Sequence, residues 1–570
     1  DLKNKYELQQ DGYGIYKYIT KGKGEEAEEV KIYLTNFNLI SATRIRFVDE
    51  DHEGVKLILK SSTGEMIEKI GEAEVFDDTK SFKNFLGTLD LAFKGKADDV
   101  TDLKTWINKF FALETEEIYN GVQFKVKDNQ VLLITNDGAV CKDKIYRNIK
   151  NDGRNNVNVM TKESLTSDEL RKIKKYIFRF ATPEKTISIL GTIINNLAVA
   201  HCKIAKVKLH HLLIIGEAGS GKSTILENVI APILNYPLNE IKSLGLATNF
   251  SLIKDLSDGN YSMIYEEHKP SRWDRYKISK ISEILRNLYD GSTVARGDKA
   301  FKSKNFYLER PIIIAGEESY HNNEKALIDR SCIIYTSKNE RTKENSAAME
   351  WIIENEGLLN KLGKDLIDVV LNISVEEYKQ LREKAKENIK DLKDRPLNTA
   401  INIAMGIEIL NILLKKHGIK TISGYMDHII KNIKSEVLEG GEEAHSVVEQ
   451  MLVLYNDMID DSRALNIDDV VRYRSDGIFI KTSEMINQIR EHVNKVGADI
   501  IPLGLKDFKK QASKAGYLEG CSNKVVKIGL KSVRFDTYNR ELLRALKVHA
   551  IVPPEIIEIT DEDNKVIPFN

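Results

Sequence analysis

The sequence predicts a multidomain α/β protein built around a central phosphate-binding domain. Its 570 residues are too many for one hydrophobic core. The apolar run Leu212–Ile215 leads directly into Gly216–Ser223, which reads G-x-x-x-x-G-K-S and precedes a helical stretch. The hydrophobic period changes from two residues in Tyr13–Val75 to a helical period in Ser346–Asn456. The predicted divisions are an α+β domain at 1–150, a helical collar at 151–205, the core at 206–340, a helical lid at 341–460 and a basic domain at 461–570.

The composition excludes several classes of protein. Lys and Arg number 85 against 86 Asp and Glu, so the formal charge is −1 and any nucleic-acid site must be local. The four cysteines are widely spaced, which argues against a zinc site or a disulfide framework: Cys141, Cys202, Cys332 and Cys521. We see no apolar run near the ~20 residues that cross a bilayer. We therefore expect a cytoplasmic protein with no membrane partner.

The region before the core is predicted from its periodicity. Tyr13–Val75 alternates in short pieces typical of an antiparallel sheet, and Asp78–Leu113 is helical. A further β segment follows at Val122–Thr135, and the polar stretch Asn148–Asn158 marks a boundary. Apolar residues at helical spacing in Ser164–Cys202 predict the collar. The N-terminal domain is thus β-rich, and it leads into the core through helices.

The glycine-rich segment predicts a site for ATP. A buried strand delivers the chain into a tight turn whose backbone N–H groups surround phosphates at a helix N-terminus. Lys222 is expected to reach the β- and γ-phosphates, and the Ser223 hydroxyl to coordinate Mg²⁺. The predicted nucleotide-binding residues are Gly216, Glu217, Ala218, Gly219, Ser220, Gly221, Lys222, Ser223 and Thr224.

Two further strands are predicted to end in acids. Tyr261–Tyr265 runs into Glu266 and Glu267, at the place of a Walker B pair. We expect Glu266 to hold Mg²⁺ and Glu267 to polarise the attacking water, although Glu266 stands where Asp is usual. Pro311–Ala315 is a third strand, and Glu317 follows it at the position that senses the γ-phosphate.

A basic hairpin is predicted just before the third strand. Ser292–Arg296 and Ala300–Phe306 are β-rich, and they flank Gly297-Asp298-Lys299. The alternative is a solvated hairpin whose lysines only keep an exposed edge soluble.

The last part of the chain is basic and has the element order of a winged helix. Between Val471 and Ala550 there are sixteen Lys or Arg against eight Asp or Glu. Helices are predicted at Ser483–Val496 and Leu505–Ala515, and a hairpin at Lys524–Phe535. Exposed lysines or protein contacts remain an alternative to binding of double-stranded DNA. The candidate DNA contacts are Lys506, Lys509, Lys510 and Lys514 on the second helix, and Lys527, Lys531 and Arg534 on the hairpin.

The order of these motifs, ending in Ala326–Ser331, resembles the AAA+ module of superfamily III and minichromosome-maintenance helicases. More closely, the chain resembles the self-loading replication helicases of bacterial mobile elements, such as staphylococcal pathogenicity islands and SCCmec cassettes. The motif match covers Leu212–Tyr335, and the flanking domains match only in general layout. The resemblance implies an AAA+ P-loop ATPase core with a collar, a lid and a C-terminal winged helix.

The resemblance also implies roles for individual residues. Arg330 is the arginine finger offered to a neighbouring subunit, and a salt bridge with Asp329 or Glu324 is the alternative. The hairpin residues implied to grip DNA in a ring's channel are Arg296, Lys299 and Lys302. Family members carry Asn or another small polar residue where this chain has Glu317. Arg395, at the start of the lid helices, is a further candidate for contacting nucleotide in trans.

We therefore predict an ATP- and Mg²⁺-dependent hexameric DNA helicase that initiates replication of a mobile element. It would translocate on single-stranded DNA and recognise its double-stranded origin through the C-terminal domain. Two alternatives remain open. One is an origin-binding initiator that is switched by ATP and does not unwind. The other is a primase-helicase, although residues 1–150 lack a convincing Asp-x-Asp pair.

Overall fold

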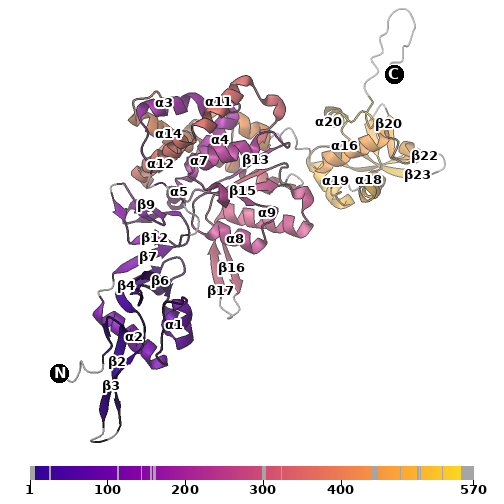
Figure 1. Ribbon diagram of the computed structural model, residues 1–570. Coiled ribbons are helices and arrows are strands. Elements are labelled where there is room, and N and C mark those ends of the chain that lie inside the picture. Colours follow the sequence, from indigo (N-terminus) through magenta and orange to yellow (C-terminus); the bar gives the residue numbers. More distant parts are fainter. Residues whose placement is uncertain are drawn as a thin grey trace, which may run out of the picture.

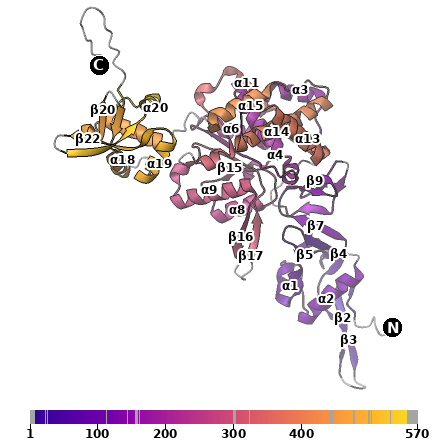
Figure 2. The ribbon, with the colours of Figure 1, turned by 180° about the vertical axis from the view of Figure 1, so that it is seen from behind.

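The computed structural model describes residues 7–553, apart from 23, 25–26, 112–113, 143, 154–156, 158, 160–161, 298–302, 322–323, 439–446, 475–476, 497–499, 501 and 529–530. Nor does it describe the side chains of 296–297, 303–304, 339, 473–474, 514, 520–528 and 531–532. The chain is a multidomain α/β protein. Figure 1 shows the N-terminal sheets and the C-terminal unit on opposite sides of a central body, and Figure 2 shows the same arrangement from behind.

The N-terminal region consists of three small sheets and two helices. A five-stranded sheet has the order β12-β7-β4-β5-β6, and α1 and α2 pack beside it around a core of their own. The strands are β1 (Gln9–Asp11), β2 (Gly14–Lys21), β3 (Glu28–Tyr33), β4 (Asn38–Phe47), β5 (His52–Lys60), β6 (Met66–Glu72), β7 (Thr115–Tyr119), β8 (Gln123–Lys127), β9 (Gln130–Thr135), β10 (Gly138–Val140), β11 (Ile145–Tyr146) and β12 (Ile149–Asn151). The helices are α1 (Thr79–Leu86) and α2 (Ala97–Phe110).

A close joint ties this region to the central body. The Asn260 side chain accepts from the Phe124 N–H at 2.7 Å and donates to its carbonyl at 2.7 Å. A Cβ on Gly121 would lie 2.4 Å from the carbonyl oxygen of Asp258, so the two backbones touch here. Because Phe124 also belongs to the central hydrophobic core, β8 is packed as part of that body.

The central sheet is parallel, with the order β14-β15-β18-β13-β19. Apart from the short edge strand β14, its strands are mostly buried and rich in Leu, Ile, Met and Tyr, as expected for a sheet covered on both faces. The strands are β13 (His211–Gly216), β14 (Lys242–Ser243), β15 (Met263–His268), β18 (Ile312–Gly316) and β19 (Ser331–Thr336). The accompanying helices are α6 (Lys222–Ile225), a π-helical turn (Leu226–Ile230), α7 (Ala231–Ile233), α8 (Asn249–Ser257), α9 (Arg275–Asp290) and α10 (Lys325–Ile328).

The predicted hairpin is present. β16 (Thr293–Gly297) pairs antiparallel with β17 (Ser303–Tyr307), with Arg296 opposite Lys304. Figure 1 shows both strands extending away from the central body below α8. The Phe306 ring lies edge-on to Phe250 of α8 at 6.0 Å, and this contact anchors the base of the hairpin.

The collar and lid helices share one core with the sheet. Buried residues from Val122 to Val437 form a single apolar cluster, so these predicted segments pack as one body. The collar helices are α3 (Ser167–Tyr176), α4 (Pro183–Asn196) and α5 (Val199–Ile204). The lid helices are α11 (Lys343–Glu354), α12 (Glu356–Asn372), α13 (Val375–Glu387), α14 (Asp394–Lys416) and α15 (Tyr425–Ile433).

Helix α14 corrects one expectation. Among the described helices, it alone is long and apolar enough to cross a membrane by length and composition. However, 78% of its most apolar stretch is buried inside the protein. It packs on α4 so closely that a Cβ on Gly406 would lie 1.8 Å from the Gly191 carbonyl oxygen. The apolar side chains of α14 therefore pack against α4 inside the protein.

The C-terminal unit has a separate core, and that core includes α16 (Val447–Asp460). The sequence predicts that these residues belong to the lid, but Met451, Leu452 and Tyr455 of α16 are buried in the C-terminal core. The four-stranded sheet has the order β20-β21-β23-β22. The remaining elements are α17 (Ile467–Val470), β20 (Val471–Arg474), β21 (Gly477–Ile480), α18 (Thr482–Val496), α19 (Leu505–Lys514), β22 (Leu518–Ile528), β23 (Lys531–Tyr538) and α20 (Arg540–Ala545).

The α4–α14 crossing yields a stability prediction. Gly406→Ala should lower the free energy of unfolding of the central body by more than about 2 kcal/mol, because the new methyl group meets backbone. Gly357→Ala in α12 is the matched control, since no atom lies within 4 Å of its Cβ position. Urea-induced unfolding should show an earlier transition for Gly406→Ala only. Equal midpoints for both variants would contradict the close crossing.

Candidate nucleotide-binding site and DNA interface

The loop between β13 and α6 has a backbone that requires glycine. Gly219 and Gly221 adopt φ of 77° and 99°, which side chains other than glycine rarely tolerate. A Cβ on Gly216 would lie 2.0 Å from the Thr336 carbonyl oxygen at the end of β19. Helix α6 begins immediately afterwards at Lys222 and extends through the π-helical turn and α7. Its free N–H groups therefore face the loop, as an anion site requires.

Lys222 lies along this loop. Its Nζ donates to the carbonyl oxygens of Gly216 at 2.7 Å and Glu217 at 2.8 Å. Burial lowers the pKa of Lys222, and the nearby Glu317 and Glu217 carboxylates oppose that shift. The ammonium group is therefore held next to the loop amides, where phosphate oxygens can replace its carbonyl partners.

The predicted acids meet the phosphate loop in one cavity of about 580 Å³. Because β13, β15 and β18 are parallel, their carboxyl ends lie at the same edge of the sheet. The predicted residues that line this cavity are Ala218, Gly219, Lys222, Ser223, Glu266, Glu267 and Glu317. The fold thus brings together three segments that are separated by up to about a hundred residues in the sequence.

Glu266 and Glu267 differ in their surroundings. Glu266 is half-buried, and burial followed by the Glu267 and Glu227 charges raises the pKa of its carboxyl group. Glu267 is exposed and has a left-handed backbone with φ of 60°, where the β15–β18 register shifts. Such a backbone costs about 1–3 kcal/mol in a residue other than glycine. The Ser243 hydroxyl donates a hydrogen bond to the Glu267 carboxylate and fixes its direction.

Glu317 is neutralised by a neighbouring lysine. Its carboxylate lies 2.6 Å from Lys269 Nζ, and this hydrogen bond is the main cause of a lowered pKa of Glu317. Its backbone N–H donates to the His268 carbonyl at 3.1 Å, which joins the ends of β15 and β18. The pair places a cation close to the predicted phosphate position, whereas Glu317 alone would repel phosphate.

Several cations near the loop were missed in the sequence. Lys269 and Arg272 line the cavity directly after the second strand. After the last strand, the Lys338 N–H donates to Glu217 at 2.8 Å, and Arg341 Nη2 lies 2.9 Å from the Cβ position of Gly221. Each of these cations follows the carboxyl end of a sheet strand. The same position predicted the acids of the site, and it could have predicted these cations as well.

A second cavity, of about 420 Å³, lies on the other side of the loop. Apolar side chains from the predicted collar and from α11 line it, together with Gly221 of the loop and Thr224 of α6. Such a pocket suits a planar base beside the phosphate site. Its other principal lining residues are Phe180, Thr182, Lys185, Ile225, Arg341, Met349 and Ile353. No sequence pattern joined these residues, since they come from distant segments.

Arg330 lies at the opposite edge of the sheet from the loop. Its carbonyl accepts from the His211 N–H at the start of β13, and its guanidinium is buried. Nη1 donates to the Ala326 carbonyl at 2.7 Å, and Nη2 lies 3.2 Å from Asp290. The salt bridge is therefore with Asp290, not with Asp329 or Glu324. From this edge, Arg330 cannot reach the phosphate loop of its own chain.

The exposed Arg395 lies at the same edge, at the start of α14. Its charge and that of Arg330 both lower the pKa of Tyr289, although burial raises it overall. The Arg330 guanidinium stacks over the Tyr289 ring at 5.3 Å. Two arginines thus surround Tyr289, one buried and one exposed.

The candidate DNA contacts are only partly described. Lys299 and Lys302 lie outside the described residues, as do the side chains of Arg296, Lys514, Lys527 and Lys531. On α19, Lys506 and Lys510 are exposed, whereas Lys509 forms an ion pair of 2.8 Å with Asp536. Arg534 is exposed on β23, opposite Val525. The pairing of Lys509 removes it from the freely available charges on this helix.

Comparison with known proteins identifies the fold. No protein-family model and no curated protein matches the chain. A solved structure of SCCmec type IV Cch, described as an active helicase, aligns with a TM-score of 0.55 and 14% identity. The alignment covers 95% of this chain and 98% of that one. The two chains share one fold. The resemblance to the self-loading helicases of mobile elements, which rested on motifs, is thus confirmed at the level of the fold.

An apo form of the NrS-1 C-terminal region aligns over 87% of this chain, with 11% identity and a TM-score of 0.31. That TM-score is too low to establish a shared fold.

The geometry around Lys222 predicts the effect of its removal. Lys222→Ala should weaken ATP binding by about 10- to 100-fold, because a charge-assisted contact is worth about 1.5–3 kcal/mol. Lys280→Ala, an exposed lysine on α9 paired with Glu283, is the matched control. Titration with a fluorescent ATP analogue measures both dissociation constants. Equal affinities for the two variants would remove Lys222 from the site.

Proposed function

We propose that this chain is an ATP-dependent hexameric DNA helicase that initiates replication of a mobile genetic element. The observation that carries the proposal is the single cavity in which the phosphate loop, Glu266, Glu267 and Glu317 converge. The central sheet order and the fold shared with an active helicase over 95% of the chain add support. In this proposal the central body is an AAA+ module and the C-terminal unit a winged helix.

The residues of the cavity divide the work of hydrolysis. The loop amides and Lys222 bind the β- and γ-phosphates of ATP, and the second cavity receives the base. Ser223 and Glu266 hold Mg²⁺, which neutralises charge on the phosphates. Glu267 orients the attacking water, and Ser243 directs that carboxylate. The ion pair of Glu317 and Lys269 faces the γ-phosphate and senses it.

Completion of the site requires a second subunit. The positive charge that stabilises the transition state comes from the opposite sheet edge of a neighbour, where Arg330 and Arg395 lie. Arg330 must exchange Asp290 for phosphate when the interface closes. Hydrolysis is therefore coupled to ring assembly. Arg395 supplies a second, exposed cation beside Arg330.

DNA binding is assigned to two regions. The hairpins of six subunits would surround a channel, where Arg296, Lys299 and Lys302 contact backbone phosphates with little regard for sequence. The exposed Lys506 and Lys510 on α19 would contact the double-stranded origin.

A second candidate is an initiator that is switched by ATP and does not unwind. The buried Arg330–Asp290 pair favours it, because an isolated chain keeps its candidate finger away from any nucleotide. A forked-duplex assay separates the two functions.

Unwinding is the first test. In the presence of ATP and Mg²⁺, the chain should separate a forked DNA substrate as a ring-sized assembly, with the mass measured in the same buffer. Lys222→Ala should abolish strand separation, and Glu267→Gln should bind ATP but lower hydrolysis at least about 100-fold. ATP hydrolysis by a ring without any strand separation would favour the switched initiator.

The hairpin assignment has its own test. Lys299→Ala should leave ATP affinity unchanged and slow unwinding, because it removes one phosphate contact per subunit from the channel. Its binding of single-stranded DNA should also depend less on salt. Lys280→Ala serves again as the surface control. Unwinding by Lys299→Ala at the parent rate would refute the assignment.

A further inference from the structure

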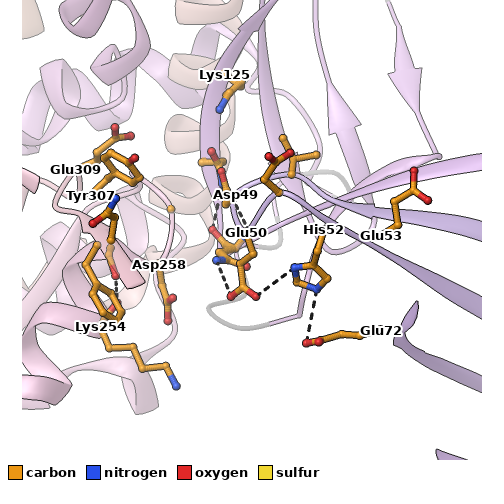
Figure 3. A pocket seen from close by; sticks show the side chains of 18 of the residues that line it. Asp49, Glu50, His52, Glu53, Glu72, Lys125, Lys254, Asp258, Tyr307 and Glu309 are labelled. Atoms are coloured by element: carbon orange, nitrogen blue, oxygen red, sulfur yellow. Dashed lines mark hydrogen bonds and ion pairs between the residues drawn. The ribbon is translucent and has the colours of Figure 1, made fainter. Parts of the chain in front are cut away.

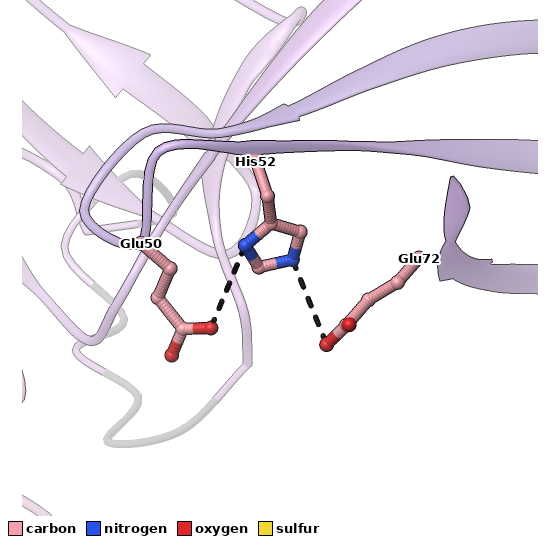
Figure 4. Close-up of side chains that lie close together, drawn as sticks. All are labelled: Glu50, His52 and Glu72. Carbon is pink, nitrogen blue, oxygen red and sulfur yellow. Dashed lines mark ion pairs between the residues drawn. The ribbon is translucent and has the colours of Figure 1, made fainter. Parts of the chain in front are cut away.

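Three potential metal ligands meet in the N-terminal region, far from the phosphate loop in the sequence. Glu50 lies in the turn between β4 and β5, His52 begins β5 and Glu72 ends β6. One ligand atom from each residue lies within 4.8 Å of the other two. His52 Nδ1 is 3.8 Å from a Glu50 oxygen, and Nε2 is 3.6 Å from a Glu72 oxygen. Figure 4 shows both carboxylates pointing toward the imidazole.

The backbone and a ring contact hold the imidazole in place. Strand β5 pairs with β4 on one side and β6 on the other, so His52 and Glu72 lie at neighbouring strand ends of one sheet, and Glu50 lies in the turn that joins β4 to β5. The Phe47 ring stacks on His52 at 4.6 Å with an interplanar angle of 24°. The two carboxylates are on longer side chains and can adjust around this fixed ring.

The surroundings favour a cation. The three residues line a cleft of about 980 Å³ between the N-terminal region and the central body (Figure 3). Its lining includes eight carboxylates but only three lysines, a difference of five negative charges. In addition, His52 Nε2 is buried without a hydrogen-bond partner in the described part of the chain. A metal ion that binds this nitrogen would supply the partner that a buried polar atom requires.

We propose that Glu50, His52 and Glu72 form a binding site for a divalent transition-metal ion of the Zn²⁺ kind. Imidazole and carboxylate are ligands that Zn²⁺ accepts, whereas Mg²⁺ and Ca²⁺ prefer oxygen alone. Ligand atoms bound at about 2.1 Å in tetrahedral geometry lie about 3.4 Å apart. The Glu72 oxygen, 3.6 Å from Nε2, needs only a small side-chain movement to reach this value. The Glu50 carboxylate, 3.8 Å from Nδ1, must turn further to reach an ion on the Nε2 side of the ring. One ring nitrogen binds the ion, and water completes the coordination.

This site is separate from the proposed Mg²⁺ site and goes beyond the proposed function. An ion here ties the β4–β5 turn to the end of β6 and offsets two of the negative charges of the cleft. The opposite wall of that cleft includes Asn305, Phe306 and Tyr307 of β17 and the residue that follows α8, Asp258. The ion therefore stiffens the wall that faces the base of the hairpin.

The test is a Zn²⁺ titration of the full chain, stripped of metal and free of nucleotide, by calorimetry with a competing chelator. His52→Phe keeps a ring to stack on Phe47 but has no nitrogen ligand, and Glu72→Gln removes an exposed carboxylate. Glu53→Gln is the matched control, because Glu53 lines the same cleft outside the three-residue set. Circular dichroism without metal checks that each variant is folded.

The parent and Glu53→Gln should each bind one more equivalent of Zn²⁺ than His52→Phe. Glu72→Gln should bind that equivalent at least about tenfold more weakly. If the parent protein bound no Zn²⁺, or if His52→Phe bound as much Zn²⁺ as the parent, the proposed metal site would be refuted. The three residues would then form only a cluster of ion pairs. If His52→Phe were misfolded, Glu72→Gln alone would decide. Unwinding is not measured here, so this result does not depend on the helicase proposal.

Discussion

The parallel pairing of β13 with β18 and β19 is the constraint on which the candidate site depends. In a parallel sheet, the carboxyl ends of the strands lie at the same end of the sheet. The phosphate loop, Glu266 and Glu317 therefore meet there although they are far apart in the sequence. The same register sends Arg330, at the start of β19, to the other edge. One topological fact therefore brings together the residues of the proposed hydrolytic site and separates Arg330 from them.

Close backbone approaches connect this sheet to the helices around it. Gly216 lets the loop touch the end of β19, and the segment after β19 carries Lys338 and Arg341 back to the loop. Gly191 and Gly406 let α4 and α14 cross with their backbones in contact. Because the predicted collar, the sheet and the predicted lid share one core, the phosphate loop and the helices that line the second cavity pack as one body.

Charge is organised differently in the two clefts. Around the phosphate loop, the acids lie among Lys222, Lys269, Arg272 and Arg341, a mixture of charges that suits the ATP and Mg²⁺ of the proposed function. In the N-terminal cleft, carboxylates outnumber lysines, and a histidine stands between two of them. In the two proposals, the first pattern serves a nucleotide with its cation, and the second serves a cation alone.

The sequence by itself determined the features that are local along the chain. The phosphate loop, the acids near the carboxyl end of strand β15 and the β16–β17 hairpin could be predicted, because glycine turns, buried strands and period-two runs depend on neighbouring residues. The tertiary structure alone decided the partners of long-range contacts. Asp290 as the partner of Arg330, the pairing of Lys509 with Asp536, the place of α16 in the C-terminal core and the cavity between collar and α11 all join distant segments. Such contacts depend on how elements pack in space, which periodicity and spacing do not encode.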